Sequence, residues 1–198
     1  MQLFTNGLHL KNREQTAAKA SGGMDPEVLQ KCKKGDRGAQ KAVYDSLASK
    51  MYAVCMRYMG GDRDLAADIL QDGFVTLFTK LDSYSGEGSF EGWARKIFVN
   101  TALMSLRKKD VLRQTEDVDA AWNISVDSPT PIQNIGYQEL CKMIAALPPG
   151  FRTVFNMYVI EGFSHKEIAE ELGISETTSR SQLQRARSLL QSKIKERF

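Results

Sequence analysis

Apolar residues recur along most of this chain at intervals of three and four positions, which is the period of an amphipathic α-helix. Almost no segment alternates apolar and polar residues in the manner of a β-strand. The spans in which the helical period is sustained are, approximately, residues 26–34, 37–59, 63–81, 89–109, 137–147, 149–160, 164–171 and 176–196. The pattern therefore predicts an all-α protein.

Two stretches lack this period and divide the chain. Residues 1–24 end near a Ser-Gly-Gly sequence and are predicted to be a flexible N-terminal tail. Residues 112–136 contain two prolines, and we expect them to be a flexible linker. The predicted organisation is two small helical domains, residues 25–111 and 137–198, each with four helices.

Charge is distributed unevenly, although the formal net charge is only +3. Basic residues cluster at 107–113 and again at 180–197, whereas neither Lys nor Arg occurs between Gln114 and Cys141. Asp and Glu do occur in that interval, so the predicted linker is acidic. Two cationic zones separated by an acidic stretch indicate two places where a polyanion docks.

Other features exclude several classes of protein. The three cysteines are widely spaced, which favours reduced thiols over a disulfide framework or a zinc site. No apolar run is long enough for a membrane span, and the first residues lack the apolar core of a signal peptide. No phosphate-binding loop, metal cluster or nucleophile–base pair is visible. We therefore expect a cytoplasmic protein without enzymatic activity, cofactor or membrane contact.

The C-terminal half carries the signals of a helix-turn-helix. Ser164 and Glu167 have the spacing of a capping box, Gly173 permits a sharp turn, and Ser175 can cap the next helix. Arginine, glutamine and serine side chains lie off the apolar face of that second helix, and these residue types bind base edges and phosphates. An ordinary helical hairpin with a solvated basic face is the alternative. His165 is expected to face solvent in the first turn.

The helix at 63–81 has one apolar side, with Leu70, Phe74, Leu77 and Leu81. The opposite stripe is formed by Asp64, Asp68, Asp72 and Thr79, flanked by Gln71 and Val75. Such a stripe is most often a solvated face. If it has a partner, that partner is a basic protein surface, because acidic side chains repel DNA.

The helix at 89–109 is predicted to bury Phe90, Trp93, Ala94, Ile97, Thr101 and Met104. Its other side would present Lys96, Asn100, Leu103 and Arg107, a stripe suited to a phosphate backbone and a base edge. The preceding loop, Asp82 to Ser89, is polar, and we expect Tyr84 to be exposed in it. A loop of this kind beside a basic helix can receive an unstacked base.

These segments resemble, in order and spacing, the extracytoplasmic-function group of bacterial RNA polymerase sigma factors. Residues 68–74 (DILQDGF) look like region 2.2, which docks on the clamp helices of the polymerase β′ subunit. Residues 90–107 look like regions 2.3 and 2.4, which melt and read the −10 element. Residues 147–155, 162–169 and 185–187 look like region 4, which reads the −35 element. The resemblance covers about residues 25–197.

The resemblance implies three sets of binding residues. The implied core polymerase contacts are Asp68, Gln71, Asp72 and Val75. The implied −10 contacts are Tyr84, Lys96, Asn100, Arg107 and Lys108. The implied −35 contacts are Thr177, Arg180, Ser181, Gln184, Arg185 and Arg187. The chain departs from the common pattern at Met104, where many members have Asp, at Ser179, where an apolar residue is common, and at Gln182, where a basic one is.

The resemblance also implies partners: core RNA polymerase through its β′ and β subunits, promoter DNA, and an anti-sigma factor. Two other interpretations stay open at this point. One is a conventional helix-turn-helix regulator, and the other is a protein-interaction adaptor that no longer binds DNA. The acidic stripe and the basic fourth helix argue against the first. Charge reversal at Arg180 and Arg185 would test the second, since it should abolish promoter selection by a sigma factor and change nothing for an adaptor.

Overall fold

The computed structural model describes residues 23–108 and 137–197, and these two ranges are helical and contain no strand. The predicted tail and linker fall almost entirely outside the described residues. In the N-terminal half the helices are α2 (Pro26–Lys33), α3 (Arg37–Tyr58), α4 (Arg63–Thr79), a 3₁₀ turn η1 (Leu81–Ser83) and α5 (Phe90–Lys108). In the C-terminal half they are α7 (Tyr137–Ala145), α8 (Pro149–Phe155), a π-helical turn η2 (Asn156–Ile160), α9 (His165–Leu172) and α10 (Glu176–Arg197). The all-α prediction is confirmed.

Aspartates begin the first three helices, as local sequence predicts. Asp25 accepts a hydrogen bond from the Glu27 amide at 2.8 Å, and Pro26 occupies the first helical position, where its missing N–H costs nothing. Asp36 caps α3 by accepting from the Ala39 amide at 2.7 Å. Asp62 caps α4 in the same way.

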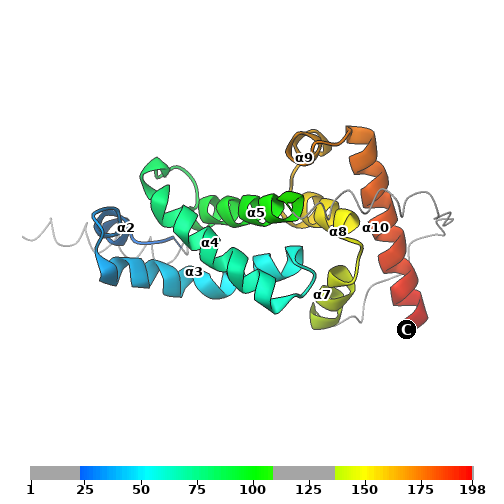
Figure 1. Cartoon of the computed structure of the whole chain (residues 1–198), viewed down its shortest axis with the longest axis horizontal. Helices are drawn as coiled ribbons and strands as arrows, with labels where there is room; N and C mark the ends of the chain where they lie inside the picture. The colour runs from blue at the N-terminus through cyan, green and yellow to red at the C-terminus, as the bar shows by residue number, and fades with distance from the viewer. Residues whose placement is uncertain (1–22, 109–136, 198) are drawn as a thin grey trace, which may run out of the picture.

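Helices α2 to α5 pack around one apolar core, seen at the left and centre of Figure 1. The buried face of α3 contains Val43, Leu47, Met51, Val54, Cys55 and Tyr58, which recur at the helical period. Gly73 of α4 lies against the Phe98 ring of α5, where a Cβ would come within 2.4 Å of ring atoms. A glycine is therefore required for α4 and α5 to approach this closely.

The exposed and buried faces of α5 differ from the prediction. Leu103, expected to be exposed, is buried, and Met104, expected in the core, is exposed. Trp93, Ile97 and Thr101 are only half-buried. The core face is instead centred on Phe98, Val99, Ala102 and Leu106. Phe90 and Ala94 are buried as predicted, but the rest of the predicted face was wrong by about one residue of helical rotation.

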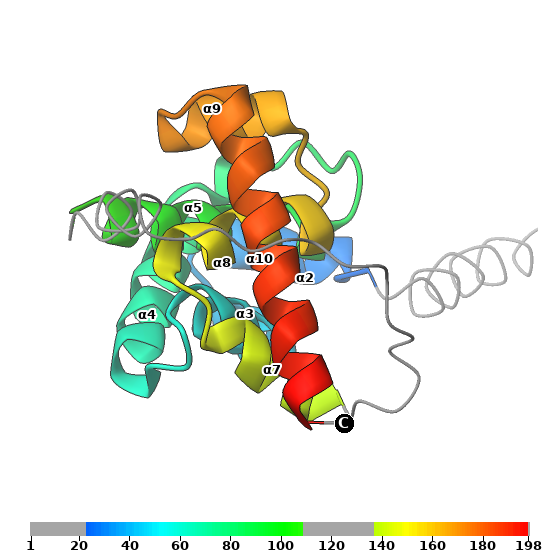
Figure 2. The ribbon, with the colours of Figure 1, turned by 90° about the vertical axis from the view of Figure 1, so that its right-hand side faces the viewer.

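The C-terminal half ends in a helix-turn-helix formed by α9 and α10. Ser164 and Glu167 make the reciprocal capping box, with the Ser164 amide donating to Glu167 Oε2 at 2.8 Å. Gly173 has a φ of +68°, as the turn requires, and Ser175 Oγ accepts from the Thr178 amide at 2.9 Å. The helix-turn-helix prediction is confirmed at each of these positions. Figure 2 shows α10 running the length of this half, with α9 at one end.

The two halves pack against each other, which the sequence did not predict. Figure 1 shows α7 to α10 gathered at the end of the bundle opposite α2. Val154, Met157, Ile168 and Leu183 join the apolar core of the N-terminal half. A smaller core inside the C-terminal half joins α7 and α8 to α10 through Phe151, Ala186 and Leu190.

Candidate functional site

The acidic face of α4 is free of the core, as predicted. Asp68, Gln71 and Asp72 are exposed, and Val75 is 62% exposed. The opposite side of α4 buries Phe74 and Leu77 in the core, which fixes the direction in which the acidic side chains point. Carboxylates around one exposed β-branched residue form a surface suited to a partner with basic groups and a small apolar contact.

The candidate nucleic-acid residues of α5 lie on its exposed side. Lys96, Asn100, Arg107 and Lys108 are all exposed. Arg107 Nη2 lies 3.2 Å from Glu171 Oε2 of α9, and both side chains are more than two-fifths exposed. A pair this exposed contributes little free energy, so it can exchange readily for a phosphate.

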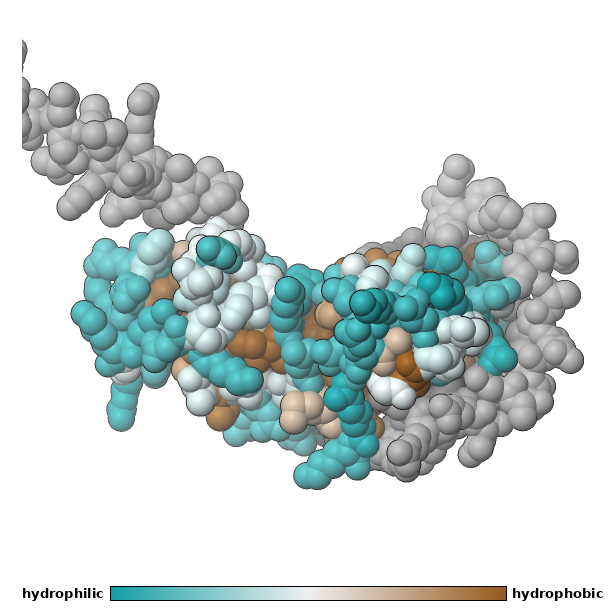
Figure 3. All heavy atoms as spheres, turned by 90° about the horizontal axis from the view of Figure 1, so that it is seen from above, coloured by the Kyte–Doolittle hydropathy of each residue, from teal (hydrophilic) through white to brown (hydrophobic). Residues whose placement is uncertain are grey.

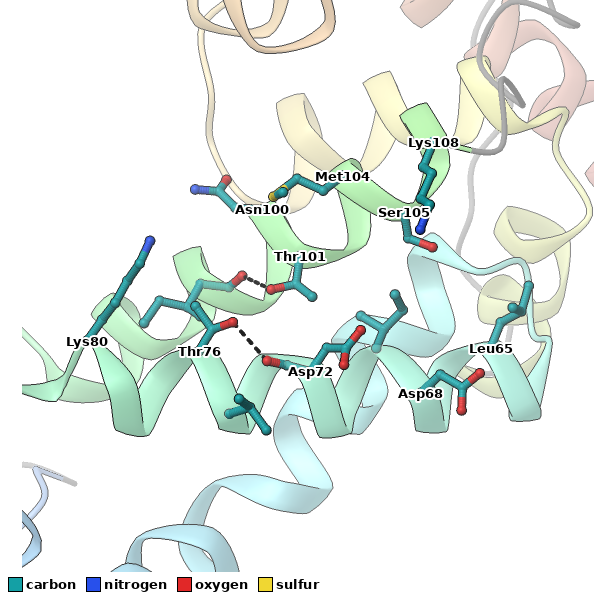
Figure 4. A pocket seen from close by; sticks show the side chains of 13 residues that line it. Leu65, Asp68, Asp72, Thr76, Lys80, Asn100, Thr101, Met104, Ser105 and Lys108 are labelled. Atoms are coloured by element: carbon teal, nitrogen blue, oxygen red, sulfur yellow. Dashed lines mark hydrogen bonds between the residues drawn. The ribbon is translucent and has the colours of Figure 1, made fainter. Parts of the chain in front are cut away.

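A groove of about 800 Å³ separates the two candidate surfaces. One wall comes from α4, with Asp68, Asp72 and Val75, and the other from α5, with Asn100 and Lys108. Figure 4 shows Asp68 and Asp72 on α4 and Asn100 and Lys108 on α5, on either side of the groove. The exposed Met104 also lines it. The groove therefore has an acidic edge and a basic edge, with apolar side chains between them.

The loop before α5 is more ordered than predicted. Tyr84 is half-buried, not exposed, because its ring packs against Phe90 and Trp93, with ring centroids 5.2 and 5.3 Å apart. Its hydroxyl donates to the Gly88 carbonyl at 2.9 Å, across the turn of the loop. The exposure expected for Tyr84 was wrong, since the aromatic residues at the start of α5 provide a packing site for it.

The recognition-helix residues divide into an outer and an inner set. Thr177, Arg180, Gln184 and Arg187 of α10 are exposed, and Ser181 and Arg185 are half-buried. Arg180 pairs with Glu176 one turn earlier at 2.9 Å, and both side chains are largely exposed. The apolar side of α10 is buried through Leu183, Ala186 and Leu190, as predicted. The outer set can therefore reach a ligand without rearrangement of the fold.

His165 does not face solvent as expected. Its ring stacks on Tyr158 with centroids 4.4 Å apart, and its Nδ1 is hydrogen-bonded to Ser179 Oγ at 2.9 Å. Burial, and then the neighbouring Arg180 guanidinium, lower the pKa of His165. The imidazole is therefore neutral near pH 7, since its ordinary pKa is already below that value.

A set of buried polar residues between the two halves was missed by the sequence analysis. Arg152 donates from Nε to the Tyr58 carbonyl at 3.3 Å and from Nη1 to the carbonyls of Ala145 and Leu147 at 2.9 and 2.8 Å. Burial lowers the pKa of Arg152. Asn156 Nδ2 donates to the Arg57 carbonyl at 3.2 Å. The contacts that join the two halves, from Arg152 to Tyr58 and from Asn156 to Arg57, link positions 94 and 99 residues apart, so no local signal in the sequence marks them.

One face of the molecular surface is polar enough to suit polar partners. Figure 3 shows one face as largely hydrophilic, with small apolar patches near its middle. Within the ranges 23–108 and 137–197, no helix is both long and apolar enough to cross a bilayer. The same residues contain no cluster of three potential metal ligands.

Comparison with known families gives two matches along the chain. Residues 43–111 match the family described as Sigma-70 region 2, and residues 137–190 match the family described as Sigma-70, region 4. Together these matches account for both helical halves.

Three curated relatives are similar over most of this chain. ECF RNA polymerase sigma factor SigE of Mycolicibacterium smegmatis is 32% identical over 79% of this chain, and the match spans 63% of that relative. The ECF RNA polymerase sigma-E factor of Haemophilus influenzae is 28% identical over 86% of this chain and 95% of the relative. SigW of Bacillus subtilis is 27% identical over 85% and 95% respectively.

One solved structure with a similar fold is the sigma factor RpoE of Bartonella quintana in complex with the anti-sigma factor NepR. It is 24% identical, with a TM-score of 0.49, over 78% of this chain and 96% of that chain.

Proposed function

The chain belongs to the extracytoplasmic-function sigma factors of the sigma-70 family, and we propose that residues 25–111 bind core RNA polymerase and the −10 element while residues 137–198 bind the −35 element. In this role the protein directs promoter recognition and transcription initiation in the cytoplasm, by binding and not by catalysis. Residues 112–136 are the proposed linker between the two domains.

The observation that carries this assignment is that one chain exposes surfaces of opposite charge on separate helices. Asp68, Asp72 and Val75 of α4 form the proposed polymerase contact, with Gln71 beside them. An acidic surface is repelled by DNA, so its partner is a protein, and the β′ and β subunits are the partners that the family uses. Exposed cationic side chains on α5 and α10 are free to meet phosphates.

Strand opening is assigned to α5 and the loop before it. Lys96, Arg107 and Lys108 would hold the backbone of the DNA, and Asn100 would meet a base edge. Tyr84 would contribute an aromatic edge next to a captured base, still packed on Phe90 and Trp93. In this arrangement the free energy for unpairing comes from binding the unpaired strand.

The −35 element would be read by α10. Arg180 and Gln184 lie on the exposed side and have the side chains that bond guanine and adenine edges. Thr177 and Ser181, near the start of the helix, and Arg185 and Arg187, one to two turns later, would contact bases or neighbouring phosphates. Binding both promoter elements through one tethered protein raises selectivity above that of either contact alone.

The polymerase contact is tested by reversing the acidic face. Asp68→Lys with Asp72→Lys should reduce co-elution with purified core polymerase by at least about tenfold, because two attractive contacts become repulsive. The matched control is Glu27→Lys with Asp45→Lys, which changes charge equally at exposed positions of α2 and α3. Equal co-elution of both variants with core would refute the assigned surface.

The DNA contact is tested separately in the holoenzyme. Arg180→Glu with Arg187→Glu should leave polymerase binding intact and abolish transcripts that start at a defined site. Lys31→Glu with Lys41→Glu, exposed lysines on α2 and α3, serves as the control of equal charge change. Unchanged start sites in the arginine variant would refute the assignment. A conventional helix-turn-helix regulator would bind DNA without any core polymerase.

We also propose an anti-sigma factor as a regulatory partner, since members of this family are commonly held inactive by one. The exposed acidic face of α4 is the surface for which such a regulator would compete with core polymerase. A regulator of this kind should bind wild-type chain but lose affinity for the Asp68→Lys, Asp72→Lys variant.

A further inference from the structure

Three side chains from consecutive elements meet at the start of the helix-turn-helix. Tyr158 belongs to η2, His165 is the first residue of α9, and Ser179 lies in the first turns of α10. The Tyr158 and His165 rings stack with an interplanar angle of 22°, and His165 Nδ1 is 2.9 Å from Ser179 Oγ. This chain of contacts joins the element before the motif to both of its helices.

Ser179 is an unusual residue for its position, because it is 0% exposed within a segment whose other buried contacts are mostly apolar. A buried hydroxyl without a partner destabilises a fold, because it loses its hydrogen bonds to water and gains none in return. His165 supplies that partner. The burial of Ser179 is therefore explained by its hydrogen bond to His165, and the position of the His165 ring is explained by the same bond.

The hydrogen bond between His165 and Ser179 is directional, whereas the apolar packing around it is not. Ile168 and Leu183 hold α9 and α10 through apolar contacts, which tolerate small rotations of one helix against another. A hydrogen bond between ring nitrogen and hydroxyl tolerates much less rotation. It acts next to Arg180 and Ser181, so a rotation of α10 that broke it would also displace those side chains.

We propose that His165 and Ser179 are a positioning pair that fixes the orientation of α10 in the major groove and thereby sets the selectivity for the −35 sequence. The Tyr158 ring holds the imidazole in the required plane. Neither residue needs to touch DNA for this role. The inference rests on the proposed function, since it concerns how the assigned recognition helix is held.

Selectivity is measured with holoenzyme reconstituted from the full chain and core polymerase, on a promoter library whose upstream hexamer is randomised. The enrichment of the preferred hexamer among transcribed molecules reports selectivity. Yield of holoenzyme and affinity for a random-sequence duplex are measured in parallel, and they should not change in any variant. Thermal unfolding of each variant shows that it is folded.

The variants distinguish the effect of losing the hydrogen bond from the effect of losing side-chain volume. Ser179→Ala and His165→Phe each remove the bond, the second while keeping a ring against Tyr158. His165→Asn removes the ring but places an amide near the position of Nδ1, so it can restore the bond. The double variant Ser179→Ala, His165→Phe replaces both partners by apolar groups and completes a double-mutant cycle.

We expect each single removal to lower the enrichment of the preferred hexamer by roughly fivefold, the size expected for one hydrogen bond. The double variant should be no worse than either single variant, and His165→Asn should stay within about twofold of wild type. Additive losses, or variants that select the same hexamer as strongly as wild type, would overturn the pairing. If wild type itself selects no hexamer, the proposed function fails, and this inference fails with it.

Discussion

Glu161, which follows η2, lies 2.9 Å from Arg57 of α3, and this ion pair joins the two halves of the molecule. The Glu161 side chain is only 5% exposed, and its second oxygen is 3.8 Å from Arg95 of α5. One carboxylate thus faces two guanidinium groups from two helices. In the described part of the chain, Arg57 Nε and Asn156 Oδ1 are buried at the same boundary without hydrogen-bond partners. Such unpaired atoms weaken the contact between the halves, so it is suited to separation.

Glu161→Gln should open the two halves relative to each other. The substitution leaves Arg57 at a largely buried boundary without its counter-charge, whereas Arg95 keeps Glu91 as a partner at 3.4 Å. The cost is about 1–3 kcal/mol after allowance for the partial exposure of Arg57. Separation of the halves rehydrates the arginines and relieves that cost. Small-angle X-ray scattering should therefore give a larger radius of gyration than for wild type, together with a secondary structure that circular dichroism finds unchanged.

The control is Glu170→Gln, at an exposed position of α9. It removes the same charge and should leave the scattering curve as in wild type. Superposition of the Glu161→Gln and wild-type curves would contradict the role assigned to the ion pair.

Gly60 permits the close approach of Arg152 from the other half. Its φ is +67°, and a Cβ there would lie 2.7 Å from Arg152 Nη1. Gly35 has a φ of +82° but nothing within 4 Å of its virtual Cβ. Gly35→Ala therefore measures backbone strain alone, about 1–2 kcal/mol, and Gly60→Ala measures strain plus displacement of the guanidinium.

We expect Gly60→Ala to lower the free energy of unfolding in urea by about 1 kcal/mol more than Gly35→Ala, because the displaced guanidinium loses buried hydrogen bonds. Measured in an Arg152→Ala background, Gly60→Ala should cost about as much as Gly35→Ala, because no guanidinium is left to displace. Equal losses in the two alanine variants would show that the guanidinium moves aside freely.

The features that the sequence predicted correctly are those set by neighbouring residues. The Ser164–Glu167 box and the turn at Gly173 each need only a few adjacent positions. The contacts of Arg152 and Glu161 could not be predicted, because they depend on how two domains meet. The contacts among Tyr158, His165 and Ser179 cross the connections before and after α9. The hydrophobic period carries no information about which side chains meet there.

The rotation of α5 shows where periodicity fails. Leu103 and Met104 are adjacent and similarly apolar, so the pattern alone cannot tell which of them is buried. In the structure Leu103 is 1% exposed and Met104 is 68% exposed. Leu103→Ala should lower the free energy of unfolding by about 2–4 kcal/mol through a core cavity. Met104→Ala should change it by less than about 0.5 kcal/mol, as surface substitutions do. Comparable losses in urea unfolding would contradict the observed face.

The capping box gives the helix-turn-helix a dependence on pH that can be assigned to one carboxylate. Hydrogen bonds from the Ser164 amide and hydroxyl hold the pKa of Glu167 below its ordinary value. A carboxyl with a lower pKa in the folded state stabilises that state above its unfolded pKa, and the contribution disappears as pH falls through the folded pKa. Stability should therefore decline in acid partly through this group.

Glu167→Ala should unfold at a lower temperature than wild type near pH 7, and the difference should shrink as the pH falls through the lowered pKa of the folded-state carboxyl. Glu167→Gln can still accept a bond from the Ser164 amide but carries no titrating group. Its melting temperature should therefore fall less steeply with acid than that of wild type. The measurement is thermal unfolding of the three proteins across this range. A gap between wild type and Glu167→Ala that stays unchanged as the solution is acidified would show that the charged cap does not account for the loss.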